Sequence, residues 1–517
     1  FLDDIESESV PRVEQYLSEI KVIRRIAGKI IEFLEQLENF QKKLWLKKKF
    51  VTETSWCIRV GCIPVKFLPE IAANDAQRQE WVALHAIDEI EGDLTMPAYS
   101  EPLTVEFLKA HPTLMVNTRN FEEGFSQRLL EAMGDIDEQI DGVLFHSENA
   151  QALRVIRSKL TGKVSNVYLD PPYNTGDDGF SYKDSYQSSS WLTMMEERVE
   201  QGFNLLRKDG VFFVSIGDEE QEHLSTLMRQ IFGKDRFFAN LIWEKKKKGS
   251  FLNGKIVRMK DYIACVAKNP ERITGLVGEI ATDTETYPVI KTTNARGERT
   301  IRKGIVSKFR EKDYYLSAGA RISSGNMELI LLSDLVIQNG VLDKDVKVDS
   351  NWIYGQDSLD KYVDEGSLYI TQDLYFRRTV SEPRYKRMRD ILQRVGEEGE
   401  HDFRAFDVNN LNRYGWGSNE DANDELHQLL GTQYAVSYPK PSKLLTLLLI
   451  ASRHQEGEWL DYFAGSGTTG HAVINLNRED GRRRKFTLVE MGEYFDTVLL
   501  PRLKKVTFTP EWDAGKP

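Results

Sequence analysis

The chain has little cysteine and no long apolar run. Its three cysteines among 517 residues, Cys57, Cys62 and Cys265, are irregularly spaced, so we expect neither a disulfide framework nor a metal site. The most apolar stretch, residues 444–450, is far shorter than the ~18 residues that a membrane span needs, and it predicts a buried helix. No signal-peptide pattern opens the chain. Together these absences predict a soluble protein of the prokaryotic cytoplasm.

Positive charge is not in excess either, since the formal net charge is −11. A negative total argues weakly against a nucleic-acid partner, but binding depends on where the cations lie. They cluster at residues 47–49, 245–248, 384–389 and 482–485. For each cluster a solvated surface is as good an interpretation as a phosphate contact, except at 245–248, which directly follow a predicted core segment.

Apolar periodicity divides the chain into four regions. Residues 12–46 carry apolar side chains at helical spacing and predict a long amphipathic helix, whose stripe we expect to be core rather than a surface for a partner helix. It opens a helix-rich N-terminal region, residues 1–140. From there short apolar runs alternate with helical patterns. We predict strands at 143–145, 166–169, 211–216, 261–267, 459–463 and 486–489, and helices at 150–160 and 191–207.

Strands that alternate with helices predict an α/β fold with a largely parallel, Rossmann-like sheet. The pattern is present at 141–270 and again at 433–517, but it disappears between them, where charge, glycine and aromatics dominate. We therefore predict one sheet assembled from two sequence halves, with a separate α+β domain, residues 271–432, inserted between them.

Two motifs carry the chemistry. The first is the run Asp170-Pro171-Pro172-Tyr173-Asn174-Thr175-Gly176. It follows a predicted strand, so its carboxylate, carbonyls and ring lie at the carboxyl edge of the sheet, where ligand sites of α/β proteins lie. The prolines make the turn stiff and remove two donors, which leaves acceptors for an exocyclic amine. We predict Asp170, Pro171, Pro172 and Tyr173 as the catalytic residues, with the ring stacked on a base.

The second motif follows the strand predicted at 459–463 and contains glycines at G-x-G-x-x-G spacing. Such glycines let an adenosine-type cofactor approach the backbone, and an acid after the next strand can bind its ribose hydroxyls. The candidate cofactor-binding residues are Asp461, Phe463, Gly465, Ser466, Gly467, Thr468 and Glu490. The motif alone would also fit NAD. Because the first motif needs a methyl donor, the combination predicts S-adenosylmethionine.

Together the two motifs resemble the amino-methyltransferases of DNA, and their order, with the catalytic motif first, resembles the β class of that family. Lys440, in the run 438–444, is similar to a Lys-Pro motif that lines the cofactor site of the family. Residues 143–149 resemble its Gly-Asp-Asn segment, with Ser147 and Glu148 in place of Gly and Asp. The resemblance thus implies cofactor contacts at Lys440, Glu148 and Asn149.

The extended catalytic run and the segments 180–184 and 262–269 are most similar to the modification subunit of type III restriction systems. That resemblance implies double-stranded DNA as substrate, a target base flipped out of the helix, a homodimer and a nuclease-helicase restriction partner. The insert would be the target-recognition domain. Residues implied to contact DNA are Lys245, Lys246, Lys247, Lys248, Asn174 and Thr175.

The target atom follows from the first residue of the catalytic run. Asp170 favours adenine N6, because the cytosine-N4 branch of the family usually has serine there. Cytosine-C5 chemistry needs a Pro-Cys nucleophile, which the sequence lacks. No nucleotide-hydrolysis loop or nuclease core is evident, so cleavage would need another subunit. Three alternatives stay open: methylation of RNA or a protein amide, a solitary methyltransferase, and a subunit that mainly recognises DNA and anchors a nuclease-helicase.

Overall fold

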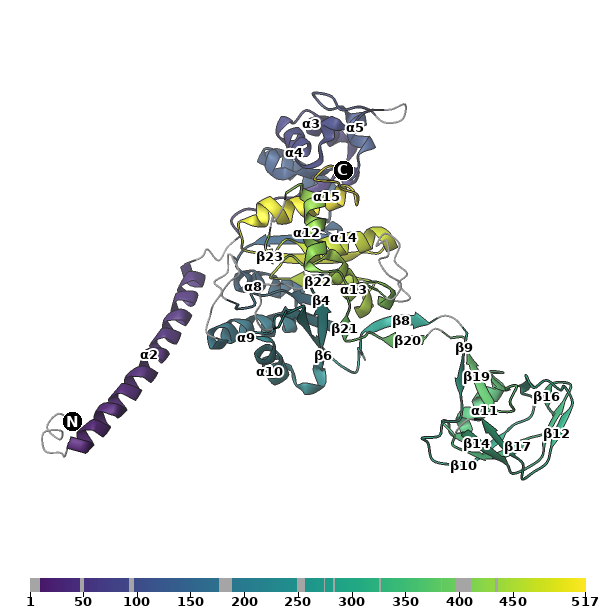
Figure 1. Cartoon of the computed structure of the whole chain (residues 1–517). Coiled ribbons are helices and arrows are strands. Elements are labelled where there is room, and N and C mark those ends of the chain that lie inside the picture. Colours follow the sequence, from purple (N-terminus) through teal and green to yellow (C-terminus); the bar gives the residue numbers. More distant parts are fainter. Residues whose placement is uncertain are drawn as a thin grey trace. The chain divides into compact units, whose positions relative to one another are not determined.

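A computed structural model describes residues 10–46, 51–92, 97–175, 188–248, 256–273, 275–281, 284–324, 327–382, 384–396, 411–432 and 436–517 (Figure 1). The chain divides into two compact units. The first comprises residues 1–278 and 387–517, and the second comprises residues 279–386. The predicted runs at 47–49 and 180–184, and Gly176 of the catalytic motif, lie outside the described residues.

An eight-stranded sheet forms the centre of the first unit, in the order β21-β6-β7-β5-β4-β22-β23-β3. The strands from β3 to β5 are parallel, β7 is antiparallel to its two neighbours, and β21 is parallel to β6. The strands are β3 (Gly142–His146), β4 (Val164–Leu169), β5 (Leu206–Ile216), β6 (Phe237–Glu244), β7 (Lys260–Ala267), β21 (Ile391–Leu392), β22 (Gly457–Asp461) and β23 (Arg484–Glu490). This confirms the α/β fold and every predicted strand, whereas β6 and β21 were not predicted.

Helices cover both faces of this sheet, because side chains alternate along each strand. Tyr168 of β4 packs with α13 and α14, whereas its neighbours Val167 and Leu169 pack with α8, α9 and α10. The predicted buried helix at 444–450 is α13, in which every residue except Lys443 and Ile450 is buried. The helices are α8 (Asn149–Leu160), α9 (Ser188–Leu205), α10 (Gln221–Phe232), α12 (Asn419–Leu430), α13 (Ser442–Ser452), α14 (Thr468–Asp480) and α15 (Leu500–Phe508).

The two sequence halves meet where β4 pairs with β22. From β4 the chain passes through α9 to β5 on one side, and from β22 it passes through α14 to β23 on the other side. The strand order therefore reverses between β4 and β22. In open α/β sheets ligands bind at the carboxyl ends of the strands beside such a reversal. Both predicted motifs follow these two strands.

The long helix predicted at 12–46 is α2 (Val10–Leu46), but the expectation that its apolar stripe is core is wrong for the single chain. Ile23, Ile30 and Leu34 are 52–64% exposed. The physical reason is that the described part of α2 makes few contacts with the rest of the chain. One of these contacts is a hydrogen bond from the Ser190 hydroxyl of α9 to Gln36 Oε1, at 2.8 Å. Among the described residues, no helix is both long and apolar enough to cross a membrane.

Residues 51–92 and 97–140 form a small helix-rich layer with its own apolar core, centred on buried residues such as Trp81, Phe107 and Leu129. Two short antiparallel strands, β1 (Cys57–Arg59) and β2 (Met115–Asn117), hold it together. Its helices are α3 (Leu68–Ala72), α4 (Asp75–His85), α5 (Val105–Ala110), α6 (Glu123–Met133) and α7 (Ile136–Gln139). The helix-rich character predicted for the N-terminal region agrees with these elements.

The second unit is shorter than the insert predicted at 271–432, and it is mostly β. Residues 387–432 belong to the first unit because β21 pairs with β6 in the central sheet. Of the described elements, a four-stranded and a seven-stranded sheet pack with α11 (Gln356–Asp364) around one apolar core. The strands are β9 (Glu285–Pro288), β10 (Gly297–Ile301), β11 (Val306–Ser307), β12 (Tyr314–Leu316), β13 (Arg321–Ser324), β14 (Met327–Leu331), β15 (Leu335–Gln338), β16 (Val341–Leu342), β17 (Val346–Ser350), β18 (Leu368–Ile370) and β19 (Phe376–Val380).

Candidate functional site

Asp170 and the residues after it lie at the carboxyl end of β4, as predicted. Asp170 Oδ2 accepts a hydrogen bond from Lys440 Nζ at 2.6 Å, and the two residues are 270 positions apart in the chain. The Pro172 carbonyl accepts from Trp191 Nε1 at 2.8 Å, and both prolines are buried. The carbonyl of Pro172 is therefore engaged by α9, which anchors the turn and leaves the Pro171 carbonyl as the predicted acceptor.

Within residues 170–173, Oδ1 of Asp170 and the hydroxyl of Tyr173 are buried, and neither makes a hydrogen bond of ordinary length and angle among the described residues. Their one polar interaction is with each other, since the Tyr173 hydroxyl also interacts with the Asp170 carboxylate. A buried acceptor that makes no bond costs about 1–3 kcal/mol, so such atoms in a native site point to a ligand. The Tyr173 ring lies against Gly217, where a Cβ atom would come within 2.9 Å of it. Burial, followed by the charge of Asp170, raises the pKa of Tyr173 well above its usual value, which keeps the hydroxyl protonated.

The glycine loop between β22 and α14 has the backbone geometry that its sequence predicts. Gly465 and Gly467 have φ values of +53° and +82°, a region that favours glycine. A Cβ atom at Gly470 would come within 2.9 Å of Leu503, so this glycine lets α14 pack closely on α15. A Cβ atom added at Gly465 would have no other atom within 4 Å, so there is open space in front of the loop.

Glu490, at the end of β23, holds the glycine loop through the backbone. Its Oε2 accepts from the Gly465 amide at 2.8 Å, and its Oε1 accepts from the amides of Met491 and Gly492, each at 2.8 Å. Burial raises the pKa of Glu490, and these three amides oppose that shift. The Tyr494 hydroxyl also hydrogen-bonds to this carboxylate, so the three amides and the hydroxyl together match its about four lone-pair sites. The predicted contact with ribose hydroxyls stays a prediction, and it would have to replace or share one of these bonds.

Asp461 is buried directly below the loop. Its Oδ2 accepts from the Thr469 hydroxyl at 2.6 Å, and its Oδ1 accepts from the Phe463 amide at 3.1 Å. Burial raises the pKa of Asp461 to about 7, and the nearby charges of Asp170 and Glu490 act in the same direction. Asp461 therefore changes charge near neutral pH, and its predicted role at the cofactor remains to be tested.

A buried ionic cluster beneath the loop was not predicted. Arg502 of α15 is fully buried, donates to the hydroxyls of Ser466 and Thr468 at 2.7 and 3.0 Å, and lies 3.3 Å from Glu425 Oε1. Glu425 of α12 also lies 3.0 Å from His471 Nδ1. The cluster fixes Ser466 and Thr468, two predicted cofactor residues. A single arginine in an amphipathic helix gives no sequence signal for this role.

Glu148 and Asn149 both contact Arg198, and the cofactor contact that the family resemblance implies for them stays a prediction. Glu148 Oε1 accepts from Arg198 at 2.9 Å, and its Oε2 accepts from the Gln151 amide at 3.2 Å, which caps α8. Asn149 accepts from Arg198 Nε at 3.1 Å and donates to the Tyr462 carbonyl at 3.2 Å. Asn149 thereby adjoins the glycine motif, while the structure gives Glu148 a role in pairing a buried arginine.

The predicted DNA-contacting lysines follow β6, but two of them are paired with carboxylates. Lys245 Nζ lies 2.6 Å from Asp261 Oδ1, and Lys247 forms an ion pair with Asp421. Lys246 is partly exposed and Lys248 is exposed.

The other predicted DNA contacts follow Tyr173. The Asn174 amide donates to Glu220 Oε1 at 2.7 Å, and Thr175 is exposed. Contact with DNA stays a prediction for all six residues, and the structure gives Lys245, Lys247 and Asn174 protein partners that such contact would have to replace.

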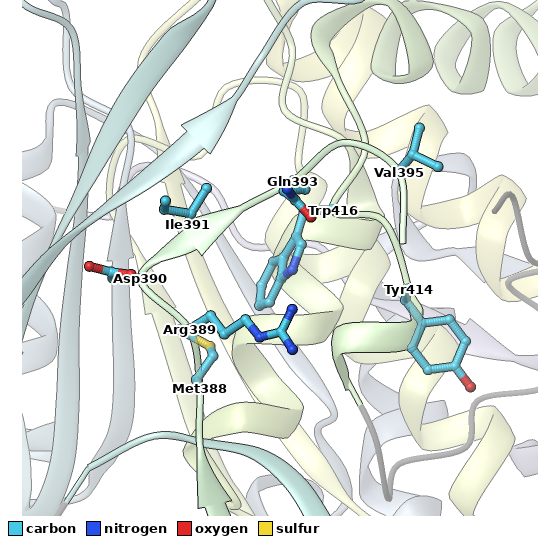
Figure 2. Close-up of a pocket in the computed structure, with 8 residues that line it drawn as sticks. All are labelled: Met388, Arg389, Asp390, Ile391, Gln393, Val395, Tyr414 and Trp416. Atoms are coloured by element: carbon cyan, nitrogen blue, oxygen red, sulfur yellow. The ribbon is translucent and has the colours of Figure 1, made fainter. Parts of the chain in front are cut away.

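A cavity of about 440 Å³ lies beside β21 (Figure 2). Its lining comes from the segments 388–395 and 414–416 and includes the Trp416 ring. Because none of its lining residues belongs to either motif, we place the candidate site at the carboxyl ends of β4 and β22, where the strand order reverses, and not in this cavity. Among the described residues no cluster of side chains could hold a metal ion.

An open sheet with a glycine loop and a buried acid beside its strand reversal defines an α/β protein that binds a ligand at the carboxyl ends of its strands. The particular family follows from comparison with known proteins. Residues 164–498 match the model of the DNA methylase family, and the chain belongs to that family.

The relatives are consistent with that membership. The chain is 27% identical to the type III restriction-modification enzyme StyLTI Mod subunit of Salmonella typhimurium over 67% of this chain and 52% of that protein. It is 26% identical to the EcoPI Mod subunit of Escherichia phage P1, over 68% and 57% respectively. It is 23% identical to the type II methyltransferase M.KpnI of Klebsiella pneumoniae, over 72% and 85%. The chain thus spans little more than half the length of these Mod subunits.

Proposed function

We propose that this protein transfers a methyl group from S-adenosylmethionine to the N6 amine of an adenine flipped out of double-stranded DNA. The observation that carries the proposal is the buried Oδ1 of Asp170, beside the glycine loop, which accepts no hydrogen bond of ordinary length and angle among the described residues. An exocyclic amine is a donor that would satisfy it. Membership of the DNA methylase family supports a methyl group as the transferred unit.

The residues at the glycine loop fit such a cofactor. Space lies in front of Gly465, and ribose hydroxyls could reach Glu490 by replacing the Tyr494 hydroxyl. When bound, S-adenosylmethionine supplies a methyl carbon activated by the adjacent sulfonium. The loop is preorganised by Glu490 from one side and by Arg502 from the other, so little order has to be gained on binding.

Asp170 and the Pro171 carbonyl then act on the nucleophile. The adenine amine is a poor nucleophile because its lone pair is delocalised into the ring. Asp170 Oδ1 accepts a hydrogen bond from one N–H of the amine and favours the tetrahedral form of the nitrogen, in which the lone pair is free to attack. The proton released after attack can pass to the same oxygen. Stacking of the base on Tyr173 would contribute about 1–3 kcal/mol to holding it there.

We further propose that the chain is the modification and recognition subunit of a type III-like system. The sequence similarity to StyLTI and EcoPI Mod subunits supports this, and the second unit is the proposed target-recognition domain. The exposed apolar residues of α2 support an interface with a second copy or with a nuclease-helicase partner. A solitary methyltransferase is the alternative, supported by the similarity to M.KpnI, a type II enzyme.

Asp170→Ala tests the catalytic assignment. Removing an acceptor that acts in the transition state should lower the rate of methyl transfer at least 10²- to 10³-fold. Binding of duplex DNA should stay within about threefold, because the oxygen is buried and phosphate contacts dominate affinity. Asp235→Ala, at an exposed position of the same unit, is the matched control and should keep full activity.

The product identifies the base. Duplex DNA treated with the protein and labelled cofactor is digested to nucleosides and analysed by mass spectrometry. N6-methyladenine supports the proposal, whereas N4-methylcytosine would assign the protein to the other amine chemistry. Methylation of RNA or protein with none on DNA, or full activity of the Asp170→Ala variant, would refute the mechanism.

A further inference from the structure

Lys440 connects the glycine loop to Asp170. Its carbonyl accepts a hydrogen bond from the Thr468 hydroxyl at 3.1 Å, and Thr468 is in turn held by Arg502 at 3.0 Å. Pro439 and Pro441 flank the lysine and fix φ on both sides of it. The backbone of Lys440 is therefore tied to the cofactor loop before its side chain makes any contact.

The side chain of Lys440 ends at the catalytic carboxylate. Nζ lies 2.6 Å from Asp170 Oδ2, and the lysine side chain is only 7% exposed. The ammonium also lies over two rings, 5.2 Å from the centroid of Tyr173 and 5.9 Å from that of Trp243. Rings of this kind stabilise a cation over their faces. The ammonium is thus fixed between β4 and β6 rather than directed into solvent.

The two oxygens of Asp170 consequently differ. Oδ2 is bound to Lys440, whereas Oδ1 is buried and accepts no hydrogen bond of ordinary length and angle among the described residues. The Tyr173 hydroxyl is the other group that interacts with this carboxylate. A carboxylate turns easily about its last torsion, which is broad and roughly two-fold. A short ion pair to one oxygen removes that freedom and aims the other oxygen in a single direction.

We propose that Lys440 is a positioning residue that couples the cofactor loop to Asp170 and presents Oδ1 as the acceptor for the amine of the target base. This inference rests on the proposed function, since it specifies how the catalytic carboxylate of that reaction is oriented. Lys440 neither receives the methyl group nor removes the proton. It acts through Asp170, and its attachment to Thr468 places the carboxylate at a fixed distance from the loop that holds the cofactor.

The alternative role for Lys440 is direct contact with the cofactor, as the family resemblance implies. The two roles predict different kinetics. A positioning residue changes the rate of the bound complex, whereas a cofactor ligand changes the affinity for the cofactor. Misplacement of a reacting group by about 1 Å costs on the order of 10²-fold in rate. Loss of the ion pair should therefore lower kcat by about 100-fold and leave the dissociation constant of S-adenosylmethionine within about threefold.

The experiment compares Lys440→Met, Lys440→Arg and Lys163→Met with the full wild-type chain. Lys163 is exposed and lies one residue before β4, at the opposite end of the strand from Asp170, which makes it the matched control. Single-turnover methylation of duplex DNA is measured at saturating cofactor, and cofactor affinity is measured by calorimetry. Arginine keeps the charge and the donor, so Lys440→Arg should retain at least tenfold more of the rate than Lys440→Met.

Each result has a defined meaning. A large loss of kcat with unchanged cofactor affinity in Lys440→Met, partly restored in Lys440→Arg, supports the proposal. A cofactor affinity that falls in parallel with the rate, or wild-type kinetics in both variants, overturns it. Failure of both variants to fold, seen as loss of the cooperative thermal transition, shows that the pair serves stability and also overturns it. Wild-type and Lys163→Met proteins without activity on any DNA would instead refute the proposed function.

Discussion

Substitution of Glu148 by glutamine tests whether this carboxylate pairs a buried arginine or binds the cofactor. Arg198 is 1% exposed and Glu148 is 7% exposed, so the substitution leaves a guanidinium charge in the interior without its buried counter-ion. Removing one partner of such a pair costs about 3–5 kcal/mol. Glutamine keeps one acceptor oxygen, and Asn149 still accepts from Arg198 at 3.1 Å. We therefore expect a loss near the lower end, about 3 kcal/mol in the free energy of unfolding.

The structure supplies a control for this prediction on the same guanidinium. Glu197 lies 3.0 Å from Arg198 but is 40% exposed, and an exposed pair contributes about 1 kcal/mol or less. Urea unfolding followed by tryptophan fluorescence reports on the change, because Trp191 is buried on the same helix, α9. Equal losses for Glu148→Gln and Glu197→Gln, or a loss below about 1 kcal/mol for Glu148→Gln, would refute the reasoning.

Cofactor affinity completes the test of Glu148. A carboxylate that accepts a hydrogen bond from the cofactor contributes about 1.5–3 kcal/mol, equivalent to a roughly 10- to 150-fold loss of affinity on substitution. The Glu148 side chain is only 7% exposed and is held by Arg198 and by the Gln151 amide, so little of the carboxylate can be reached by a ligand. We therefore expect calorimetry to show a change in the dissociation constant of less than about threefold, and a tenfold loss would restore the role implied by the family resemblance.

Two further predictions concern the glycine loop and the acid below it. Burial raises the pKa of Asp461 from 3.8 to about 7, so between these pH values the native state holds a proton that the unfolded chain has lost. The contribution of this group to the free energy of unfolding therefore falls by about 4 kcal/mol as the pH rises from 4 to 7. Relative to wild type, the free energy of unfolding of Asp461→Asn should rise by about 4 kcal/mol across this pH range, as measured in urea titrations. Free energies of unfolding that change with pH in parallel in the two proteins would contradict this prediction. Gly467→Ala and Gly481→Ala, at φ values of +82° and +67° at opposite ends of α14, should each cost about 1–2 kcal/mol of stability. Only Gly467→Ala should weaken cofactor binding, because Gly467 lies in the glycine loop and its Cβ atom would come within 3.1 Å of Leu499, which would displace the loop. Equal cofactor affinities in the two variants would place the cofactor elsewhere.

The fold was largely predictable from the sequence because its signals are local. Each motif-bearing strand, β4 and β22, has apolar side chains just before an acid, Asp170 and Asp461, and the glycines after β22 match the left-handed backbone that the loop requires. The spacing of apolar residues and the residues that favour turns suffice to identify such elements. The α/β pattern predicted that the two halves of the chain share one sheet, but not that β4 would pair with β22.

The contacts that orient the site were not predictable in the same way. The ion pair between Lys440 and Asp170 joins positions 270 residues apart, and nothing in either local sequence specifies the other. The burial of Arg502 depends on how α15 packs against α12 and α14. The error about α2 has a related cause: a helical stripe such as that of Ile23 and Ile30 shows that a face is apolar, but not what covers it.

The way the second unit is attached affects how the chain can change over time. It leaves and re-enters the first unit through β8 (Val277–Ala281) and β20 (Arg384–Arg387), which pair with each other in a two-stranded ribbon. Its two ends are therefore neighbours, and its apolar core is its own. Loop-closure entropy grows only slowly with the length of chain between two fixed ends, by about 0.6 kcal/mol for each doubling. A unit of different size or sequence can thus replace this one by exchange between β8 and β20 while the sheet that carries Asp170 keeps its register.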